Sequence, residues 1–142
     1  MMIIMTEKKD LFTVPQGYYL AHCISADFAL GAGIAKTFDK VYNMRFKLFR
    51  KYNDYAYNGG DALLIDNVFN LVTKPKSYHK PSYGAVEEAL RTMKDIMKMN
   101  ATTKLAMPKI GCGLDKLDWD KVYEIICEVF EDMDVEILIC EL

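Results

Sequence analysis

The sequence predicts an α/β protein whose mostly parallel sheet is covered by helices on both faces. From residue 68 onward the chain alternates strand, helix, strand, helix, strand. Such alternation places successive strands parallel to one another, because the crossover helices pack back onto the sheet. Ligands bind at the carboxyl ends of the strands in such sheets. We therefore expect functional residues directly after Ile24, Thr73 and Pro108.

Six segments have the composition of β-strands, since they are short and rich in β-branched, aromatic and other apolar residues. Asp66 and Asn67 separate two of these segments and are typical turn residues. The predicted strands are Met2–Thr6, Tyr18–Ile24, Asp61–Ile65, Val68–Thr73, Lys104–Met107 and Val135–Cys140.

Two helices are predicted from apolar residues that recur every three or four positions. The first follows Ser82, whose hydroxyl suits an N-cap, and ends at Asn100. The second follows Asp118, which is also a preferred N-cap residue. Their apolar stripes consist of Val86, Leu90, Met93 and Met97 in the first helix, and Val122, Ile125, Ile126, Val129 and Phe130 in the second.

A third helical region is predicted within Gly33–Tyr52, with a break near Asp39. We expect this region to turn Phe46 and Phe49 toward the core. Its basic side chains are expected in solvent, and they are Lys47, Arg50 and Lys51.

Composition and charge are those of one soluble globular domain over residues 1–142, with 51% hydrophobic and 27% charged residues. The net charge of −2, with both signs interspersed, argues against non-specific nucleic-acid binding. The four cysteines are scattered, as is typical of reduced thiols in a cytoplasmic protein, and no metal site is expected. The apolar segment Met1–Met5 is too short for a signal sequence, and no run is long enough to span a membrane.

Two glycine-rich segments follow predicted strands. Gly31–Gly33 precedes a helix, where glycine lets backbone N–H groups approach an anion. Lys36 stands where a dinucleotide-binding fingerprint would need its third glycine, so that motif is broken. Pro108–Asp115 contains two further glycines. Each segment alone is compatible with an ordinary turn, but together they predict a two-sided cradle for a diphosphate.

Lys74 and Asp115 are the candidate catalytic residues. Lys74 follows a predicted strand directly, and Asp115 ends the second glycine-rich segment. Lysine is a possible nucleophile and aspartate a possible proton donor and acceptor. Asp115 by itself is equally compatible with a turn residue, whereas Lys76 and Lys80 fit a solvated connector.

The histidines and Cys112 are weaker candidates. His22 lies on a predicted core strand and is expected in the interior or on a pocket wall. His79 could act as a general base by residue type, but we expect it to brace its loop through a hydrogen bond. Nothing in the sequence places a base beside Cys112, so a cysteine nucleophile is not favoured.

Four segments resemble macrodomains, in particular the branch typified by terminal ADP-ribose protein glycohydrolase. The resemblance spans about Thr6–Leu142, with the motifs in the same order and at similar gaps. Lys9 replaces a glycine of that pattern, Pro75 replaces a basic residue, and the asparagine-rich motif of other macrodomain branches is absent. The matching segments are Ala21–Ser25, Gly31–Ala35, His79–Pro81 and Met107–Asp115.

The resemblance implies a three-layer α/β/α macrodomain with a mixed, mostly parallel central sheet and with ADP-ribose across its top. Asp10 matches the acidic residue that contacts adenine, Lys74 the catalytic lysine and Asp115 the catalytic aspartate. No cofactor is expected. The other residues expected to contact ADP-ribose are Leu11, Cys23, Ile24, Ser25, Gly31, Ala32, Gly33, Ile34, Thr73, Pro108, Ile110, Gly111, Cys112, Gly113 and Leu114.

The activity implied by the resemblance is hydrolysis of ester-type linkages to ADP-ribose. The expected substrates are ADP-ribosylated glutamate or aspartate in protein, O-acyl-ADP-ribose, or an ADP-ribosylated nucleobase. A non-catalytic ADP-ribose reader and a phosphatase of ADP-ribose 1″-phosphate stay open as alternatives. A third alternative is a nucleic-acid module that uses a basic cluster made of Lys36, Lys40, Arg45, Lys47, Arg50 and Lys51.

Overall fold

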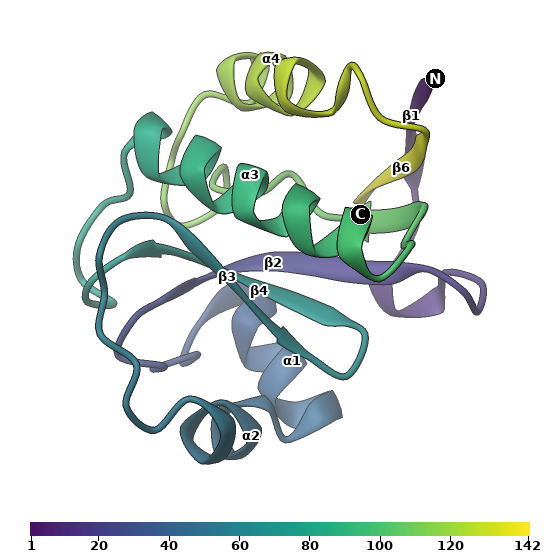
Figure 1. The fold of residues 1–142 in the computed structure, drawn as a ribbon. Coiled ribbons are helices and arrows are strands. Elements are labelled where there is room, and N and C mark those ends of the chain that lie inside the picture. Colours follow the sequence, from purple (N-terminus) through teal and green to yellow (C-terminus); the bar gives the residue numbers. More distant parts are fainter.

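A six-stranded sheet forms the middle layer of the protein, which a computed structural model describes over residues 1–142 (Figure 1). Its strands are β1 (Met2–Lys8), β2 (Tyr19–Ser25), β3 (Asp61–Ile65), β4 (Val68–Lys74), β5 (Lys104–Met107) and β6 (Val135–Glu141). The strand order is β1-β6-β5-β2-β4-β3. Neighbouring strands pair in parallel, except that β3 is antiparallel to β4.

All six predicted strands form, and the alternation after residue 68 gives the predicted parallel pairing. Several strands are one or two residues longer than predicted, and the extension of β4 brings Lys74 into the sheet as its last residue. The hairpin between β3 and β4 turns at Asp66, whose φ of +53° is one that aspartate tolerates better than most residues.

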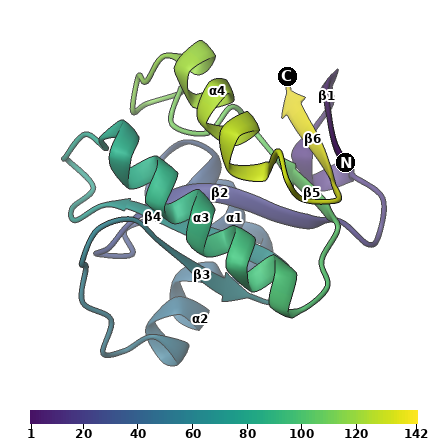
Figure 2. The same ribbon diagram turned by 45° about the horizontal axis from the view of Figure 1, so that its top comes forward.

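Four helices cover the sheet, two on each face (Figures 1 and 2). Helices α3 (Tyr83–Met99) and α4 (Trp119–Phe130) lie on one face and pack against each other. Helices α1 (Gly33–Tyr42) and α2 (Met44–Lys51) lie on the other face. The result is the three-layer α/β/α arrangement with a mixed, mostly parallel sheet that the sequence predicts. None of these helices combines the length and apolar character that a membrane crossing requires.

The sheet divides the apolar core in two, because successive side chains of a strand point to opposite faces. In β4, Phe69 and Leu71 belong to the core beneath α3 and α4, whereas Val68 and Val72 belong to the core beneath α1 and α2. A strand that is buried on both faces has a nearly continuous run of apolar residues in its sequence, and β4 is an example.

Helices α3 and α4 begin where expected, and α3 also ends where expected, directly before Asn100. Ser82 Oγ accepts a hydrogen bond from the Ala85 backbone N–H at 3.1 Å, and this caps α3. Asp118 Oδ1 accepts from the Asp120 N–H at 2.9 Å and caps α4 in the same way. Such bonds satisfy N–H groups that have no partner inside a helix.

The region Gly33–Tyr52 forms two helices, and the break lies at Asn43 rather than near Asp39. Asn43 adopts φ +56°, ψ +45°, the left-handed conformation that asparagine tolerates and that ends a right-handed helix. The chain then starts α2 with a new helical phase.

That change of phase makes one prediction wrong. Phe46 and Phe49 were expected to face the core, but they are 56% and 47% exposed. Met44 and Leu48 occupy the buried positions of α2 instead.

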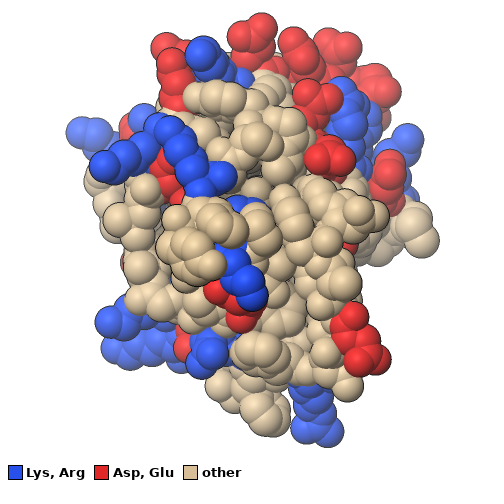
Figure 3. Space-filling view, turned by 90° about the vertical axis from the view of Figure 1, so that its left-hand side faces the viewer, with Lys and Arg blue, Asp and Glu red and all other residues tan.

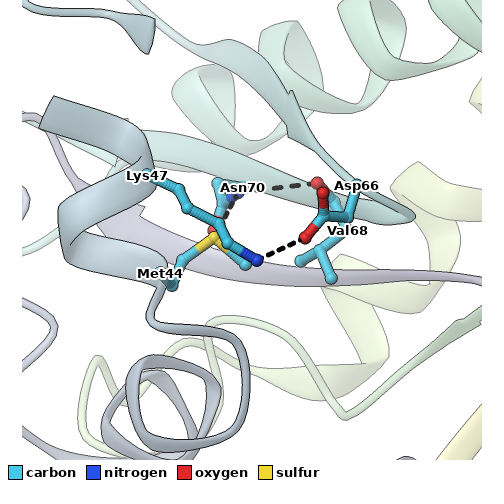
Figure 4. A network of polar contacts seen from close by, with 5 residues as sticks. All are labelled: Met44, Lys47, Asp66, Val68 and Asn70. Carbon is cyan, nitrogen blue, oxygen red and sulfur yellow. Dashed lines mark hydrogen bonds and ion pairs between the residues drawn. The ribbon is translucent and has the colours of Figure 1, made fainter. Parts of the chain in front are cut away.

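Helix α2 is fastened to the β3–β4 hairpin by polar contacts (Figure 4). Lys47 Nζ lies 2.7 Å from Asp66 Oδ2, so this lysine is only partly exposed. Beneath the pair, the buried Asn70 amide group donates to Leu63 O at 3.1 Å and contacts Met44 Sδ at 3.4 Å. Arg50 and Lys51 lie in solvent, as predicted.

Candidate functional site

A cleft of about 980 Å³ opens at the carboxyl ends of β2, β4 and β5. Figure 3 shows this side of the molecule, where a largely uncharged surface surrounds a few lysine, arginine and acidic side chains. The walls come from three loops, which leave β2, β4 and β5. Parallel strands place their carboxyl ends at one edge of a sheet, so residues far apart in the sequence converge there.

Lys74 and Asp115 meet in this cleft. Lys74 Nζ lies 2.7 Å from Asp115 Oδ1, and the two side chains are only 14% and 17% exposed. Lys74 ends β4, and Asp115 lies in the loop between β5 and α4. An ion pair that is largely shielded from water interacts more strongly than one on the open surface.

The amino terminus of α1 faces the same cleft. Gly31–Ile34 lines the cavity, and Ala32, the N-cap residue, supplies no side-chain cap. The N–H groups of the first turn have no partner inside the helix, so they are available to an anion bound in the cavity.

The loop after β5 forms the opposite wall and depends on Gly111. Gly111 adopts φ +73°, and a Cβ at this position would lie 2.9 Å from Leu117 Cδ1. Only glycine combines this left-handed backbone with the close approach of Leu117. Ile110, Gly111 and Gly113 of this loop line the cavity.

A second cavity of about 520 Å³ adjoins the first and contains Asp10 and Leu11. The two cavities share Ile34, Pro108, Lys109 and Gly113 and so lie side by side, and together they are called the elongated cleft. Asp10 lies at one end of this cleft, and the Lys74–Asp115 pair lies at the other.

Asp10 also has a local structural role. Its Oδ1 accepts a hydrogen bond from the Phe12 N–H at 3.0 Å and caps the short 3₁₀ helix Leu11–Thr13. The other carboxylate oxygen has no hydrogen bond within the protein.

Almost all of the residues expected to contact ADP-ribose line this cleft, with Thr73 as the exception. Thr73 is 1% exposed and borders neither cavity, so the structure does not bring it to the cleft surface. Cys112 borders only the cavity at the Asp10 end. The expected residues that line the cavity at the Lys74 end are Cys23, Ile24, Ser25, Gly31, Ala32, Gly33, Ile34, Pro108, Ile110, Gly111, Gly113 and Leu114.

The thiols in the cleft are poor nucleophiles. Burial, and then the negative charge of Asp115, raise the pKa of the Cys23 thiol to about 12. Burial likewise raises the pKa of Cys112. A protonated thiol does not attack, so neither cysteine is a good candidate for the nucleophile.

The two histidines lie in different surroundings. His22 is fully buried on β2, as expected, and stacks on Phe38 with ring centroids 3.9 Å apart. His79 is exposed and lines the cleft, and its ring packs against that of Tyr78 in a T-shaped arrangement with centroids 4.6 Å apart. No hydrogen bond from the His79 ring braces the loop, contrary to expectation, although its backbone N–H donates to Lys76 O at 3.0 Å.

Lys109 was not singled out from the sequence, yet it borders both cavities. Its Nζ lies 2.6 Å from Glu141 Oε2 and 6.0 Å from the centre of the Trp119 ring. Its place inside the motif Pro108–Asp115 was the available signal. Other lining residues that the sequence did not indicate as ligand contacts are Ala29, Leu30, Ala35, Ser77, Tyr78, His79, Lys80 and Lys116.

No three side chains of histidine, cysteine, aspartate or glutamate lie close enough to hold a metal ion.

No family model matches the chain. ADP-ribose glycohydrolase OARD1 of Bos taurus is 42% identical over 135 residues, which cover 93% of this chain and 87% of the relative. The protein of the same name from Homo sapiens is 41% identical over the same lengths. This chain is a macrodomain of the OARD1 family.

Solved structures agree with this assignment at the level of the macrodomain fold. The macrodomain of Thermus aquaticus DarG superposes with a TM-score of 0.86 at 21% identity, and the match covers 99% of both chains. A structure of Thermosipho africanus DarTG in complex with ADP-ribose matches 99% of this macrodomain and 42% of that chain, with a TM-score of 0.77 and 18% identity.

Proposed function

We propose that this macrodomain binds ADP-ribose in the elongated cleft and hydrolyses ester-type linkages to its distal ribose. The contact of 2.7 Å between Lys74 Nζ and Asp115 Oδ1 carries this proposal, because it places a candidate nucleophile beside a proton acceptor. Two relatives named ADP-ribose glycohydrolase, and the similarity to a protein solved in complex with ADP-ribose, support it.

The shape of the cleft suits a long ligand with an anionic middle. The adenine would lie at the Asp10 end, where a carboxylate oxygen can accept from its amino group. The diphosphate would lie between the amino terminus of α1 and the loop around Gly111. The distal ribose would then reach Lys74 and Asp115.

Lys74 would act as the nucleophile and Asp115 as the acid and base. The Lys74 amine must lose a proton before it attacks, and Asp115 Oδ1 is within hydrogen-bond distance to accept it. The neighbouring walls hold the ribose against both side chains, which raises the effective concentration of the reacting groups.

The reaction would proceed through a covalent adduct. Nζ forms a bond to C1″ of the ribose, the bond from C1″ to the ester oxygen breaks, and the carboxylate departs. The sugar ring opens as the C1″–O4″ bond breaks: O4″ takes the proton from Asp115, Nζ gives one of its protons to Asp115, and a protonated imine forms between C1″ and Nζ. Water then adds to C1″ with the help of Asp115, the C1″–Nζ bond breaks, and ADP-ribose and the free amine are released.

The test is release of ADP-ribose from a glutamate-linked model protein by wild type, Lys74→Ala and Asp115→Ala. We expect both variants to lose at least about 10³-fold of the rate, as nucleophiles and general acids or bases commonly do. Borohydride added with ADP-ribose should label Lys74 of the wild type, because it reduces the imine to a stable amine.

Lys47→Ala is the matched control. Lys47 also lies 2.7 Å from an aspartate, but Asp66 precedes the amino end of β4, whereas the cleft opens at the carboxyl end of this strand, and the Lys47–Asp66 pair is more exposed. It should keep wild-type activity and labelling. Equal labelling of Lys74→Ala would exclude the lysine adduct. Binding of ADP-ribose without any release would favour a reader or a different linkage, such as the 1″-phosphate.

A further inference from the structure

The side chain of Asp27, in the loop that leaves β2, accepts three hydrogen bonds. Its Oδ1 accepts from Ser25 Oγ at 2.5 Å and from the Ala29 backbone N–H at 3.2 Å. Its Oδ2 accepts from the Ser77 backbone N–H at 3.1 Å. Ser77 belongs to the loop that leaves β4 just after Lys74, so one carboxylate joins two loops of the cleft.

Asp27 lies behind the wall of the cleft rather than in it. All three of its partners, Ser25, Ala29 and Ser77, line the cavity, whereas Asp27 does not. A backbone bond runs beside this contact, from the Ala26 N–H to Lys74 O at 2.9 Å. The position of the Lys74 backbone is thus coupled to the loop that Asp27 organises.

The loop that Asp27 organises has an unusual backbone. Phe28 and Leu30 are buried, yet they adopt φ values of +53° and +42°. Bulky residues rarely occupy the left-handed region, and they stay there only when surrounding contacts hold them. Asp27 supplies one of these contacts, and Arg45 Nε, which donates to Phe28 O at 2.8 Å, supplies another.

The carboxyl of Asp27 is ionised at neutral pH. Burial alone would raise its pKa, but the hydrogen bonds from Ser25, Ser77 and Ala29 and the charge of Lys76 lower it below its ordinary value. An ionised carboxylate has only acceptor oxygens, which is what three donors require.

We propose that Asp27 is a positioning residue that clamps the loops after β2 and β4, and so holds Lys74 in reach of Asp115 and of the sugar. This inference rests on the proposed function. Asp27 touches neither the cavity nor Lys74, so it acts through its partners alone.

Asp27→Asn tests the clamp, because an amide keeps the shape of the side chain but replaces one acceptor oxygen by a donor. Amide hydrogen exchange should become about tenfold faster at residues 26–33 and 74–79, and unchanged in the sheet. The rate of borohydride trapping at saturating ADP-ribose should fall on the order of 10- to 100-fold, since a small misplacement of a reacting group has effects of this size. Saturation removes any contribution from weaker binding.

Asp132→Asn is the control, since it makes the same chemical change at a carboxylate that accepts from Lys94 and lies beyond the end of α4. It should leave exchange in both loops and trapping unchanged. Unchanged exchange at both loops in Asp27→Asn, or faster exchange with wild-type trapping, would overturn the positioning role. If the wild type itself trapped no ADP-ribose, the proposed function would fail, and the exchange measurement would still decide whether Asp27 clamps the loops.

Discussion

The buried histidine of β2 makes the stability of this macrodomain depend on pH in a way that can be calculated. Asn70 Nδ2 donates to Leu63 O, so Asn70 Oδ1 faces His22 and accepts from its Nε2–H at 2.6 Å. His22 Nδ1 is then unprotonated, and it has no hydrogen-bond partner. A proton added there would create a buried charge with no acceptor, and burial therefore lowers the pKa of His22 to about 4.

This pKa predicts a loss of stability in mild acid. The unfolded chain binds a proton at His22 near pH 6.5, whereas the folded chain does so only near pH 4. Between these values the unfolded state holds more protons, so the free energy of unfolding falls by about 1.4 kcal/mol for each pH unit lost. The contribution of His22 is complete above about pH 6.5, is lower by about 2 kcal/mol at pH 5, and by about 3 kcal/mol at pH 4.

Urea unfolding of wild type, His22→Gln and His79→Gln at pH 7.5 and pH 5 measures this effect. Glutamine does not titrate and can still donate to Asn70, so the stability of His22→Gln should fall about 2 kcal/mol less than that of the wild type. His79 is the other histidine and is exposed, so His79→Gln should follow the wild type. Parallel pH dependence of wild type and His22→Gln would refute this reasoning.

Two further predictions concern the start of α3. Gly60→Ala should destabilise the protein by about 3 kcal/mol or more, because the new Cβ would lie 1.9 Å from the Ala85 carbonyl oxygen. Gly84 lies within the helix, and a Cβ there would meet no close neighbour, so Gly84→Ala should stabilise the protein by about 0.5–1 kcal/mol. Thermal and urea unfolding would show both effects, and similar values for the two variants would contradict the packing argument. Ser82→Ala should lower the free energy of unfolding by about 1 kcal/mol, because the N-cap hydrogen bond is lost, and should leave ADP-ribose binding unchanged. An unchanged unfolding midpoint would argue against the cap.

Local signals were sufficient to predict much of the fold. Ser82 and Asn100 bounded α3 correctly, because a capping side chain and the end of an apolar stripe both act within a few residues of the helix end. The order of the strands in the sheet is not a local property. The sequence could not show that β2 would lie between β4 and β5.

The error in α2 has a definite geometric origin. The sequence predicted a break near Asp39, and Phe46 and Phe49, which lie three positions apart, were assigned to one inward face of the helix that follows. A single left-handed residue, Asn43, resets the helical phase. Asparagine occurs in many helices without breaking them, so its type alone was not a sufficient signal.

The candidate site was only partly predictable. Lys74 could be placed at a strand end and Asp115 in the loop after another strand from the sequence, but their separation of 41 residues leaves the 2.7 Å contact to the tertiary structure. Asp27 belongs to no motif, and two of its three donors are backbone N–H groups, which any residue type supplies. Its role could therefore be seen only in the folded chain.

The contact between Lys109 and Trp119 provides a natural optical reporter of the cleft. Trp119 is the sole tryptophan, and its indole lies 6.0 Å from the ammonium of a lysine that borders both cavities. Indole emission responds to nearby charge. An anion that draws Lys109 away from the ring would thus change the colour or yield of fluorescence, and occupancy could be followed in unlabelled protein in real time.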